Sequence, residues 1–332
     1  MGRVLVTGGA GFVGSHVADA LIRRGHDVTV LDDLSGGFRE HVPGGARFVP
    51  GDVADAPLVD ALFAASKFDH VFHLAAYAAE GLSHFIRRFN YTSNVLGSVT
   101  LLNASVNHGV RTFVFTSSIA VYGASPVLPV TEEVRPAPED PYGIAKYAVE
   151  LDLRSAHDLF GLDFVVFRPH NIYGPRQNIA DQYRNVVGIF MNQLLQGRPM
   201  TIFGDGTQTR AFSYVDDVAP LIAEAIDTPA AWNHVFNVGS DEPVSLNDLA
   251  GHVAAAMGAE AKVEHLAPRR EVAHIHAAHD RLRRVFGDRP ATPLSEGLAA
   301  MARWARAWGA RASAPFEGIE IERNLPESWR RR

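Results

Sequence analysis

The run VLVTGGAGFVGSH near the N-terminus constrains the fold of this 332-residue chain more than any other segment. A short β-branched stretch leads into Gly8, Gly11 and Gly14, which are spaced three residues apart, and a helical pattern follows them. Glycines permit a tight turn and a close approach of the backbone to a pyrophosphate, and the N-terminus of the next helix offers N–H groups to the anion. A flexible strand–helix turn is the alternative, but this strand–loop–helix order favours a dinucleotide site.

Short β-branched runs continue at regular intervals along the first half of the chain. The predicted strands cover residues 4–7, 28–32, 47–51, 71–75, 112–118 and 164–169. Helical segments separate them, and this alternation predicts an α/β fold with a doubly wound parallel sheet, the Rossmann type.

The alternation becomes irregular after Pro169, where loops rich in Gly, Pro, Asn and Gln appear. We therefore expect an NAD-binding Rossmann domain over residues 1–169, with returning segments near 211–240. Most of residues 170–332 should form a smaller α/β substrate lobe. Within it, Ser245 and Ser295 are expected to cap the N-termini of two helices.

Composition excludes several classes of function. The chain is 47% hydrophobic and 20% charged, as in an ordinary globular protein, and its net charge of −6 does not indicate nucleic acid or an anionic membrane as a partner. It has no cysteine, which excludes disulfides, thiolate metal sites and a cysteine nucleophile. Neither a signal peptide nor a membrane-spanning stretch is recognisable, and we expect a soluble, cytoplasmic protein.

Acidic residues at strand ends indicate which dinucleotide would bind. Asp32 ends the second predicted strand, where a carboxylate accepts hydrogen bonds from the adenosine ribose and repels a 2′-phosphate, which favours NAD over NADP. Asp33 is the competing residue, although it can equally cap a turn. Asp52, in the GDV that follows the third strand, is a candidate adenine contact.

Tyr142 and Lys146, in the run PYGIAK, form the candidate catalytic pair. Residues four apart on a helix share one face, and a nearby ammonium favours the phenolate form of a tyrosine. Tyr142 could then act as a base near neutral pH. Ser118, at the end of the fifth predicted strand, can hydrogen-bond a substrate hydroxyl beside it.

These motifs together resemble the extended short-chain dehydrogenases/reductases, and specifically the NAD-dependent nucleotide-sugar epimerase/dehydratase family. The resemblance covers essentially the whole chain, through TGGAGFVG, LDDLSGG, GDV, HLAA, TSSIAVYG, PYGIAK, RPHNIYGPRQ, IFGDGTQTRAFSYVDDV and LSEGL. It implies NAD as cofactor, a nucleotide-sugar substrate, no metal, and a homodimer that pairs the helices beginning near Asn94 and Gly143.

The resemblance also implies roles for particular residues. The catalytic group is Ser118, Tyr142 and Lys146. Residues implied to bind NAD are Gly8, Gly11, Phe12, Val13, Gly14, Asp32, Asp52, Val53, Leu74, Ala75, Ala76, Asn94, Tyr142 and Lys146. Residues implied to bind the substrate are Thr116, Ser117, Ser118, Asn171, Asn185, Val186, Ile202, Phe203, Arg210 and Arg269.

Two of these arginines have alternatives. Arg210 and Arg269 are implied to hold the diphosphate, with Ile202 and Phe203 flanking a uracil. Arg270 is the alternative to Arg269 as the second arginine at the diphosphate. For Arg210 the alternative is a surface ion pair with Asp216 or Asp217.

The residues after Ser118 indicate the reaction. Dehydratases of the family resemble T-D-E there and xylose-forming decarboxylases carry a glutamate nearby, whereas this chain has Ile119 and Ala120. One proton-transfer residue with a nicotinamide suits reversible oxidation at a single carbon. We therefore expect 4-epimerisation of a UDP-hexose of the UDP-glucose/UDP-galactose type. The alternatives are a UDP-glucuronate or UDP-N-acetylhexosamine 4-epimerase, another nucleotide-sugar oxidoreductase or decarboxylase, and a non-catalytic NAD-binding regulator.

The preferred sugar is less constrained. Uronate epimerases resemble R-P-D-M after V-Y-G, so Asn171 in HNIYGPRQN favours a neutral hexose. However, the segment AAYAAEGLSHFIRRFNY departs from the usual epimerase pattern and brings Tyr77, Glu80, Arg87 and Arg88 near the expected substrate side. Arg87 and Arg88 can instead form a solvated helix face, and Arg184 has the same two alternatives.

His252, His265, His274, His276 and His279 are expected to be ordinary, partly exposed residues rather than zinc ligands.

Overall fold

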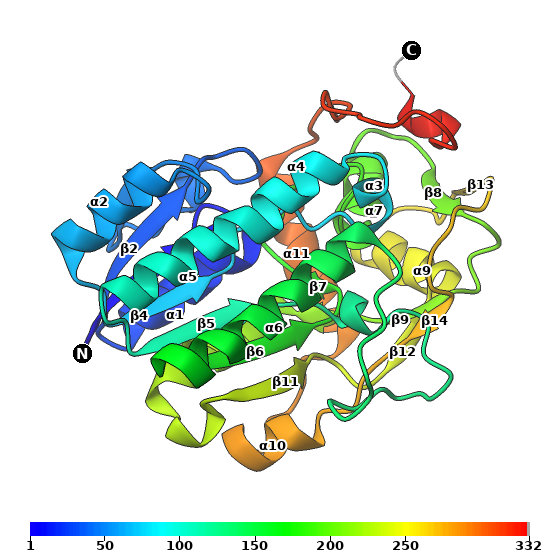
Figure 1. Cartoon of the computed structure of the whole chain (residues 1–332). Helices are drawn as coiled ribbons and strands as arrows, with labels where there is room; N and C mark the ends of the chain where they lie inside the picture. Colours follow the sequence, from blue (N-terminus) through cyan, green and yellow to red (C-terminus); the bar gives the residue numbers. More distant parts are fainter. Residues whose placement is uncertain (331–332) are drawn as a thin grey trace.

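The computed structural model describes residues 1–330 and is built around a seven-stranded parallel sheet (Figure 1). Its strands are β1 (Arg3–Thr7), β2 (Asp27–Asp32), β3 (Arg47–Pro50), β4 (His70–His73), β5 (Thr112–Thr116), β6 (Asp163–Pro169) and β11 (His234–Val238). They lie in the order β11-β6-β5-β4-β1-β2-β3, with every neighbouring pair parallel. The predicted doubly wound sheet is confirmed. Its strand order reverses between β1 and β4, and such a switch point opens a crevice at the carboxyl ends of the strands.

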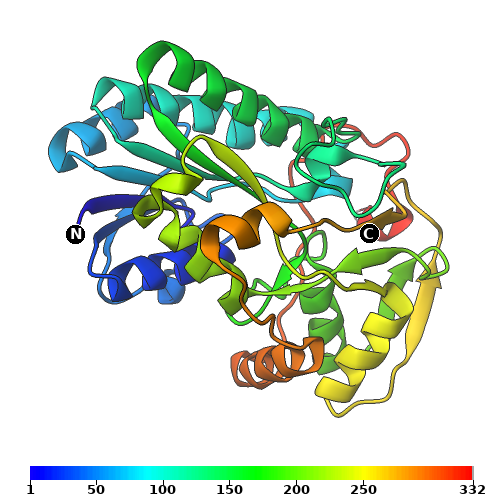
Figure 2. The same cartoon turned by 90° about the horizontal axis from the view of Figure 1, so that it is seen from below.

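Helices cover both faces of this sheet (Figure 2). One face carries α1 (Phe12–Arg23), α8 (Val215–Glu224) and α10 (Asp280–Phe286), and the other carries α2 (Ala56–Ser66), α5 (Gly97–Asn107) and α6 (Pro141–Phe160). Successive side chains of β1 point to opposite faces of the sheet. Val4 and Val6 pack in the core under α1, whereas Leu5 packs in the core on the other face. Strands buried on both sides must be continuously apolar, which is why the sequence reveals them.

The remaining elements gather beyond the carboxyl ends of the strands. They include the helices α7 (Val186–Leu195), α9 (Leu246–Ala256) and α11 (Leu294–Trp308). Three small sheets accompany them: β7 (Ile172–Tyr173) with β10 (Ser213–Tyr214), β8 (Met200–Phe203) with β13 (Val263–Leu266), and β12 (Pro243–Ser245) with β9 (Thr209–Ala211) and β14 (His274–Ile275). This part has its own apolar core, which includes Phe190, Leu249 and Met301. The division of the chain at residue 169 stays a prediction.

The chain leaves the large sheet after β6 and later re-enters it. Residues Val215–Glu224 form α8, which packs against α1, and β11 then pairs with β6 along its whole length. The segment between β4 and α5 is also irregular. It contains the short helices α3 (Glu80–Ser83) and α4 (Arg87–Tyr91), followed by a π-helical turn over Thr92–Leu96.

One of the two predicted caps is confirmed and the other is wrong. The Ser245 hydroxyl accepts a hydrogen bond from the Asp248 N–H at 3.0 Å and caps α9. Ser295 lies inside α11, whose N-cap position is Pro293, because Leu294 already packs against the apolar core of this part. No helix within residues 1–330 is long and apolar enough to cross a membrane.

After α11 the chain runs back over α3 and α4 as residues 313–330, which we call the C-terminal segment and which end in a 3-10 turn over Glu327–Trp329 (Figure 1). Its side chains Leu325 and Trp329 are buried with Leu82 and Ile86. It therefore joins the second part of the molecule to the segment that follows β4.

Candidate active site

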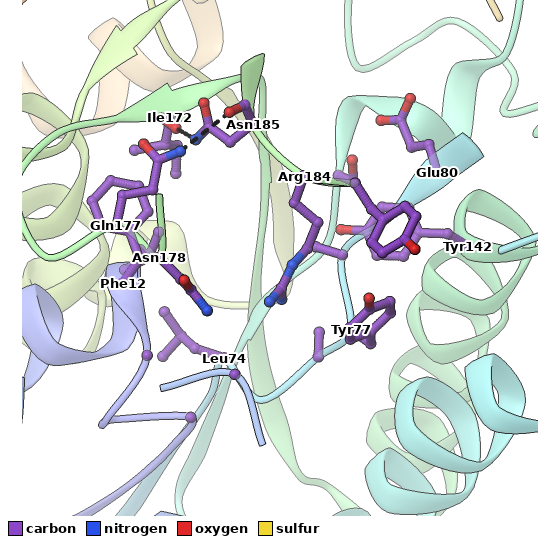
Figure 3. Close-up of a pocket in the computed structure, with 18 of the residues that line it drawn as sticks. Phe12, Leu74, Tyr77, Glu80, Tyr142, Ile172, Gln177, Asn178, Arg184 and Asn185 are labelled. Carbon is purple, nitrogen blue, oxygen red and sulfur yellow. Dashed lines mark hydrogen bonds between the residues drawn. The ribbon is translucent and has the colours of Figure 1, made fainter. Parts of the chain in front are cut away.

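A cavity of about 510 Å³ lies at the carboxyl ends of the large sheet and extends into the second part of the molecule (Figure 3). With the exception of Asn94, every site residue predicted from the sequence lines it. The sequence motifs, spread from Gly8 to Arg269, thus meet in one space.

The glycine loop makes close contacts that only glycine allows. Gly8 has φ +72°, and a Cβ there would lie 2.6 Å from the Ala75 nitrogen. A Cβ on Gly14 would lie 2.1 Å from the Gly8 carbonyl oxygen. Gly11 precedes α1 without a side-chain cap, so the first N–H groups of the helix remain available to an anion beside the cavity.

Asp32 ends β2 at the rim of this loop. Its carboxylate accepts N–H groups from Ala10 at 3.0 Å and Leu34 at 2.8 Å. Burial raises the pKa of Asp32, although these hydrogen bonds oppose the rise. Asp33, the competing residue, is exposed and accepts the Ser35 N–H at 2.9 Å. The glycine cradle and the carboxylate at the end of β2 together fit a dinucleotide such as NAD.

The third acidic residue also lies at the cavity. Asp52 accepts the Ala54 N–H at 2.8 Å, in the turn that leads to α2. This places it on the same side of the cavity as the glycine loop and Asp32, where an adenosine is expected.

Tyr142 and Lys146 lie one turn apart at the start of α6. The Asp140 side chain accepts the Gly143 N–H at 2.9 Å and caps the helix. A Cβ on Gly143 would lie 2.6 Å from the Ala120 carbonyl oxygen, so a glycine lets α6 approach the end of β5 closely. Tyr142 and Lys146 are therefore held beside Ser118, whose side chain hydrogen-bonds Tyr142.

The charges around Tyr142 differ from the sequence expectation. Burial raises its pKa, the carboxylate of Glu80 raises it further, and the hydrogen bond from Ser118 lowers it. Lys146 donates to the Thr116 carbonyl at 2.8 Å and lies 5.7 Å from the Tyr142 ring centroid. Burial lowers the pKa of Lys146 to about 7. The ammonium is thus turned toward a backbone carbonyl, and its predicted effect on the phenolate is not among the main influences on Tyr142.

A buried polar network lies beneath the catalytic group. Arg168 donates to both Glu150 oxygens, at 2.9 and 2.5 Å, and to the Tyr122 hydroxyl at 2.8 Å. The Ser117 hydroxyl donates to Glu150 at 2.5 Å. Ser117 was expected to face the substrate, but its hydroxyl is engaged in this network, which ties β5, α6 and β6 together.

Asn94 acts behind the cavity wall. Its side chain accepts the Tyr77 N–H at 3.0 Å and donates to the Tyr77 carbonyl at 3.2 Å. It also donates to the Asn90 side chain at 2.8 Å. These contacts shape the segment after β4 that carries Tyr77 into the cavity.

Two asparagines with positive φ shape the other end of the cavity. Asn171 has φ +21° and Asn185 has φ +58°. The Asn185 side chain donates to the Ile172 carbonyl, and Gln177 donates to the Asn185 carbonyl at 3.3 Å (Figure 3). The loop between β7 and α7 is thereby closed onto the cavity.

Arg210 lies in the cavity wall rather than in a surface ion pair. Its guanidinium donates to the carbonyls of Thr209 at 2.8 Å, Ala273 at 2.9 Å and Val272. Asp216 instead lies 3.5 Å from His16, and Asp217 accepts hydrogen bonds from Thr292. The ion-pair alternative for Arg210 is therefore wrong.

The neighbouring arginines 269 and 270 differ in position. Arg269 lines the cavity, with its guanidinium 4.5 Å from the Phe203 ring centroid and 3.0 Å from the Glu271 carboxylate. Arg270 is exposed and lies 3.8 Å from Glu139. The cavity thus contains the arginine that the sequence analysis preferred.

The residues left open by the sequence fall into two groups. Tyr77, Glu80 and Arg184 line the cavity, with the Arg184 guanidinium 4.7 Å from the Tyr77 ring centroid and 2.6 Å from Asp181 (Figure 3). Arg87 and Arg88 are exposed on α4, as the solvated-face alternative predicts.

Glu80 has an unusual electrostatic environment. Partial removal from water raises the pKa of the Glu80 carboxyl group to about 7, and the negative charge of the nearby Asp140 adds to the rise. The positive charges of Arg210 and Arg269 oppose it. A second ionisable group therefore lies near Tyr142, contributed by α3 rather than by the residues after Ser118.

Sequence reasoning missed several polar residues of the cavity. They are Gln177, Asn178, Gln182, Tyr183, Gln208 and Glu271. Gln177 ends YGPRQ, and Asn178, Gln182 and Tyr183 belong to the irregular loop that follows, where no periodicity identifies an inward side. Only the richness of this loop in amide side chains was a signal.

The histidines do not form a metal site within residues 1–330. His279 is buried, which corrects the expectation that it is partly exposed. Its ring nitrogens lie 2.9 Å from His170 and 2.7 Å from Asp241. His252, His265 and His274 are exposed, and His276 is half-buried.

The profile of the NAD dependent epimerase/dehydratase family matches residues 4–239. The chain belongs to this family. A UDP-glucose 4-epimerase of Mycolicibacterium smegmatis is 39% identical over 90% of this chain and 96% of its own length. The family is NAD dependent, and the glycine loop with Asp32 fits that cofactor.

Solved structures of family members have the same fold. That of UDP-glucose 4-epimerase from Thermotoga maritima, with UDP-glucose, gives a TM-score of 0.88 at 35% identity, covering 92% of this chain and 99% of the other. That of UDP-N-acetylglucosamine 4-epimerase from Methanobrevibacter ruminantium gives 0.86 at 31% identity, with the same coverage.

Proposed function

We propose that this enzyme interconverts the C4 epimers of a UDP-hexose of the UDP-glucose/UDP-galactose type, using bound NAD. The observation that carries the proposal is a single cavity that joins the glycine loop, Ser118 and Tyr142, and the two arginines Arg210 and Arg269. A dinucleotide, a proton-transfer group and a diphosphate site are the parts that this reaction needs.

Each part of the cavity has a role in the proposed reaction. NAD, when bound, supplies a reversible hydride acceptor and a positive charge that favours the phenolate of Tyr142. Tyr142 takes the proton of the C4 hydroxyl and returns it, while Ser118 holds that hydroxyl in place. Arg210 and Arg269 bind the diphosphate through charge-assisted hydrogen bonds.

Glu80 supports a neutral sugar over a uronate. It lines the cavity, and its charge acts on Tyr142 and on both arginines, so we expect it beside the hexose. When ionised, it repels a sugar carboxylate and can accept hydrogen bonds from sugar hydroxyls. An N-acetylated sugar is neutral as well, so UDP-N-acetylglucosamine is included in the test.

The test is direct. The purified protein is analysed for bound NAD and incubated separately with UDP-glucose, UDP-galactose, UDP-N-acetylglucosamine and UDP-glucuronate, and the configuration at C4 is followed by NMR. We expect UDP-glucose and UDP-galactose to interconvert without accumulation of NADH. Accumulation of NADH with no epimer formed would show a net oxidoreductase instead.

Tyr142→Phe isolates the proton-transfer step. Loss of the hydroxyl should lower kcat by at least about 10²-fold, the usual contribution of a positioned acid–base group. Bound NAD per protomer, measured after denaturation, should stay as in the wild type, because the ring remains in place. A variant that loses its NAD would show that Tyr142 serves mainly in cofactor binding.

We further propose that the enzyme is a homodimer that pairs α5 and α6 of two copies. Leu96, Ile144 and Leu151 are large apolar side chains that remain exposed in the monomer on the π-helical turn before α5 and on α6. Burying them against a second copy would remove this apolar surface from water.

A further inference from the structure

The C-terminal segment is attached to the wall of the substrate cavity through several contacts. Glu320 accepts the N–H groups of Arg88 at 2.9 Å and Phe89 at 3.0 Å, at the start of α4. The Phe316 N–H donates to the Tyr183 hydroxyl at 2.9 Å, and Tyr183 lines the cavity.

Trp329 is the point where this segment comes nearest to the cavity. Its side chain is 5% exposed, and its ring meets those of Tyr183 at 5.2 Å and Phe203 at 5.9 Å, both in edge geometry. A Cβ on Gly81 would lie 3.2 Å from the edge of the indole, so a glycine leaves room for this ring.

The cation held at this point is Arg269. Its guanidinium lies 4.5 Å from the centroid of Phe203 and 5.6 Å from that of Trp329, and it forms an ion pair with Glu271 at 3.0 Å. Two aromatic rings and a carboxylate therefore restrict a side chain that would otherwise sample many rotamers. Such restriction lowers the entropy lost when the arginine binds an anion.

We propose that Trp329 is a positioning residue that holds Arg269 in the orientation that binds the diphosphate of the nucleotide. The inference rests on the proposed function and deepens it, because it assigns the C-terminal segment to the nucleotide end of the cavity. Trp329 itself does not line the cavity and acts through Arg269.

The test measures UDP binding to the NAD-loaded protein by calorimetry, together with KM and kcat for the nucleotide sugar. Trp329→Leu keeps an apolar side chain but removes the aromatic face, and it should weaken UDP binding and raise KM by about tenfold, with kcat and bound NAD unchanged. Trp329→Phe keeps a ring and should retain most of the affinity. Trp232→Ala, at a half-buried tryptophan outside the cavity, is the matched control and should leave UDP affinity unchanged.

A double-mutant cycle separates positioning from general stability. In an Arg269→Ala background, Trp329→Leu should cause no further loss of UDP affinity, because the side chain through which it acts is gone. Additive losses, an unaltered UDP affinity in Trp329→Leu, or an equal loss in Trp232→Ala would each overturn the inference. UDP binding needs no turnover, so a wild type that binds UDP but epimerises no sugar would refute the proposed reaction alone.

Discussion

Glu80 brings a carboxyl group to Tyr142 from an element that does not carry the catalytic motif. The residues after Ser118, Ile119 and Ala120, are not ionisable, and sequence alone therefore indicates one proton-transfer group. The structure adds a second ionisable side chain near Tyr142, because the pKa of Glu80 is raised to about 7, chiefly by its partial removal from water.

Glu80→Gln tests this interaction. Ionised Glu80 raises the pKa of Tyr142, so removing the charge should shift the rise of kcat with pH toward lower pH. Turnover of UDP-glucuronate should also increase, by about tenfold, because a repelling charge is gone. Both are measured from initial rates across a pH series. Glu139→Gln, outside the cavity, serves as the control, and an unchanged pH profile in Glu80→Gln would contradict the role assigned to Glu80.

At this scale the sequence predicted which residues meet but not how their side chains are used. Ser117, Ser118 and Tyr142 were all expected at one site, and all line one cavity. However, the Ser117 hydroxyl turns to Glu150, because extended residues alternate in direction along the chain. The partner of a buried hydroxyl depends on a helix that lies more than thirty residues away, which no local pattern reveals.

At the scale of elements, α6 carries the catalytic pair on one side and exposed apolar residues on another. Leu151→Glu places a charge in the proposed dimer interface and should shift the protein from dimer to monomer. Light scattering coupled to size exclusion measures the molar mass. Asp152→Lys, at an exposed neighbouring position, should remain dimeric. A wild type that is monomeric at micromolar concentration would contradict the interface.

The Glu150–Arg168 pair joins α6 to β6, and both side chains are almost fully buried, at 1% and 2% exposure. Glu150→Ala leaves the Arg168 charge without its partner, which should cost about 3–5 kcal/mol in the free energy of unfolding. Urea unfolding measures the change. Asp152→Ala, on the exposed side of the same helix, should change it by no more than about 0.5 kcal/mol. A small effect of Glu150→Ala would show that the pair is not coupled to folding.

Elements were predictable where burial dictates composition. β1, β2, β5 and β6 were each predicted to within two residues at either end, because strands covered on both faces must be apolar. The start of α11 was misplaced, since Ser295 has the composition of a cap but Leu294 packs into the lobe core. The π-helical turn at Thr92–Leu96 has no local sequence signature.

At the scale of the whole molecule, buried histidines predict a response to acid. Burial lowers the pKa of His41 and His70 to about 4, and that of His73 and His170 to about 3. In the unfolded chain these histidines have a pKa of about 6.5. Below that pH the unfolded state therefore binds protons that the folded state, with its lowered pKa values, does not bind. Stability should therefore be complete above about pH 6.5 and fall progressively toward pH 4.

Thermal unfolding across a pH series measures this loss. Each such histidine contributes at most about 1.4 kcal/mol per pH unit over the interval between its two pKa values. His70→Gln should reduce the slope, whereas His234→Gln, at an exposed position, should not. A melting temperature that stays constant from pH 7 to about pH 4 would contradict the prediction.

The overall architecture was predictable because one strand–loop–helix motif and an alternating pattern are enough to indicate a doubly wound sheet. The position of the C-terminal segment was not predictable, because the segment lacks periodicity and is held by contacts with α3, α4 and Tyr183. Sequence-distant packing of this kind has no local signal.

The late position of the edge strand β11 in the sequence has a consequence for folding during synthesis. It pairs with β6 but is separated from it by more than sixty residues, which form β7, α7, β8, β9, β10 and α8. A nascent chain that has emerged only as far as Pro169 presents β6 as an unpaired edge and leaves α1 without its cover from α8. Such an edge invites pairing with other chains. The nascent chain is therefore most prone to aggregate after β6 has emerged from the ribosome and before β11, which ends at Val238, has emerged.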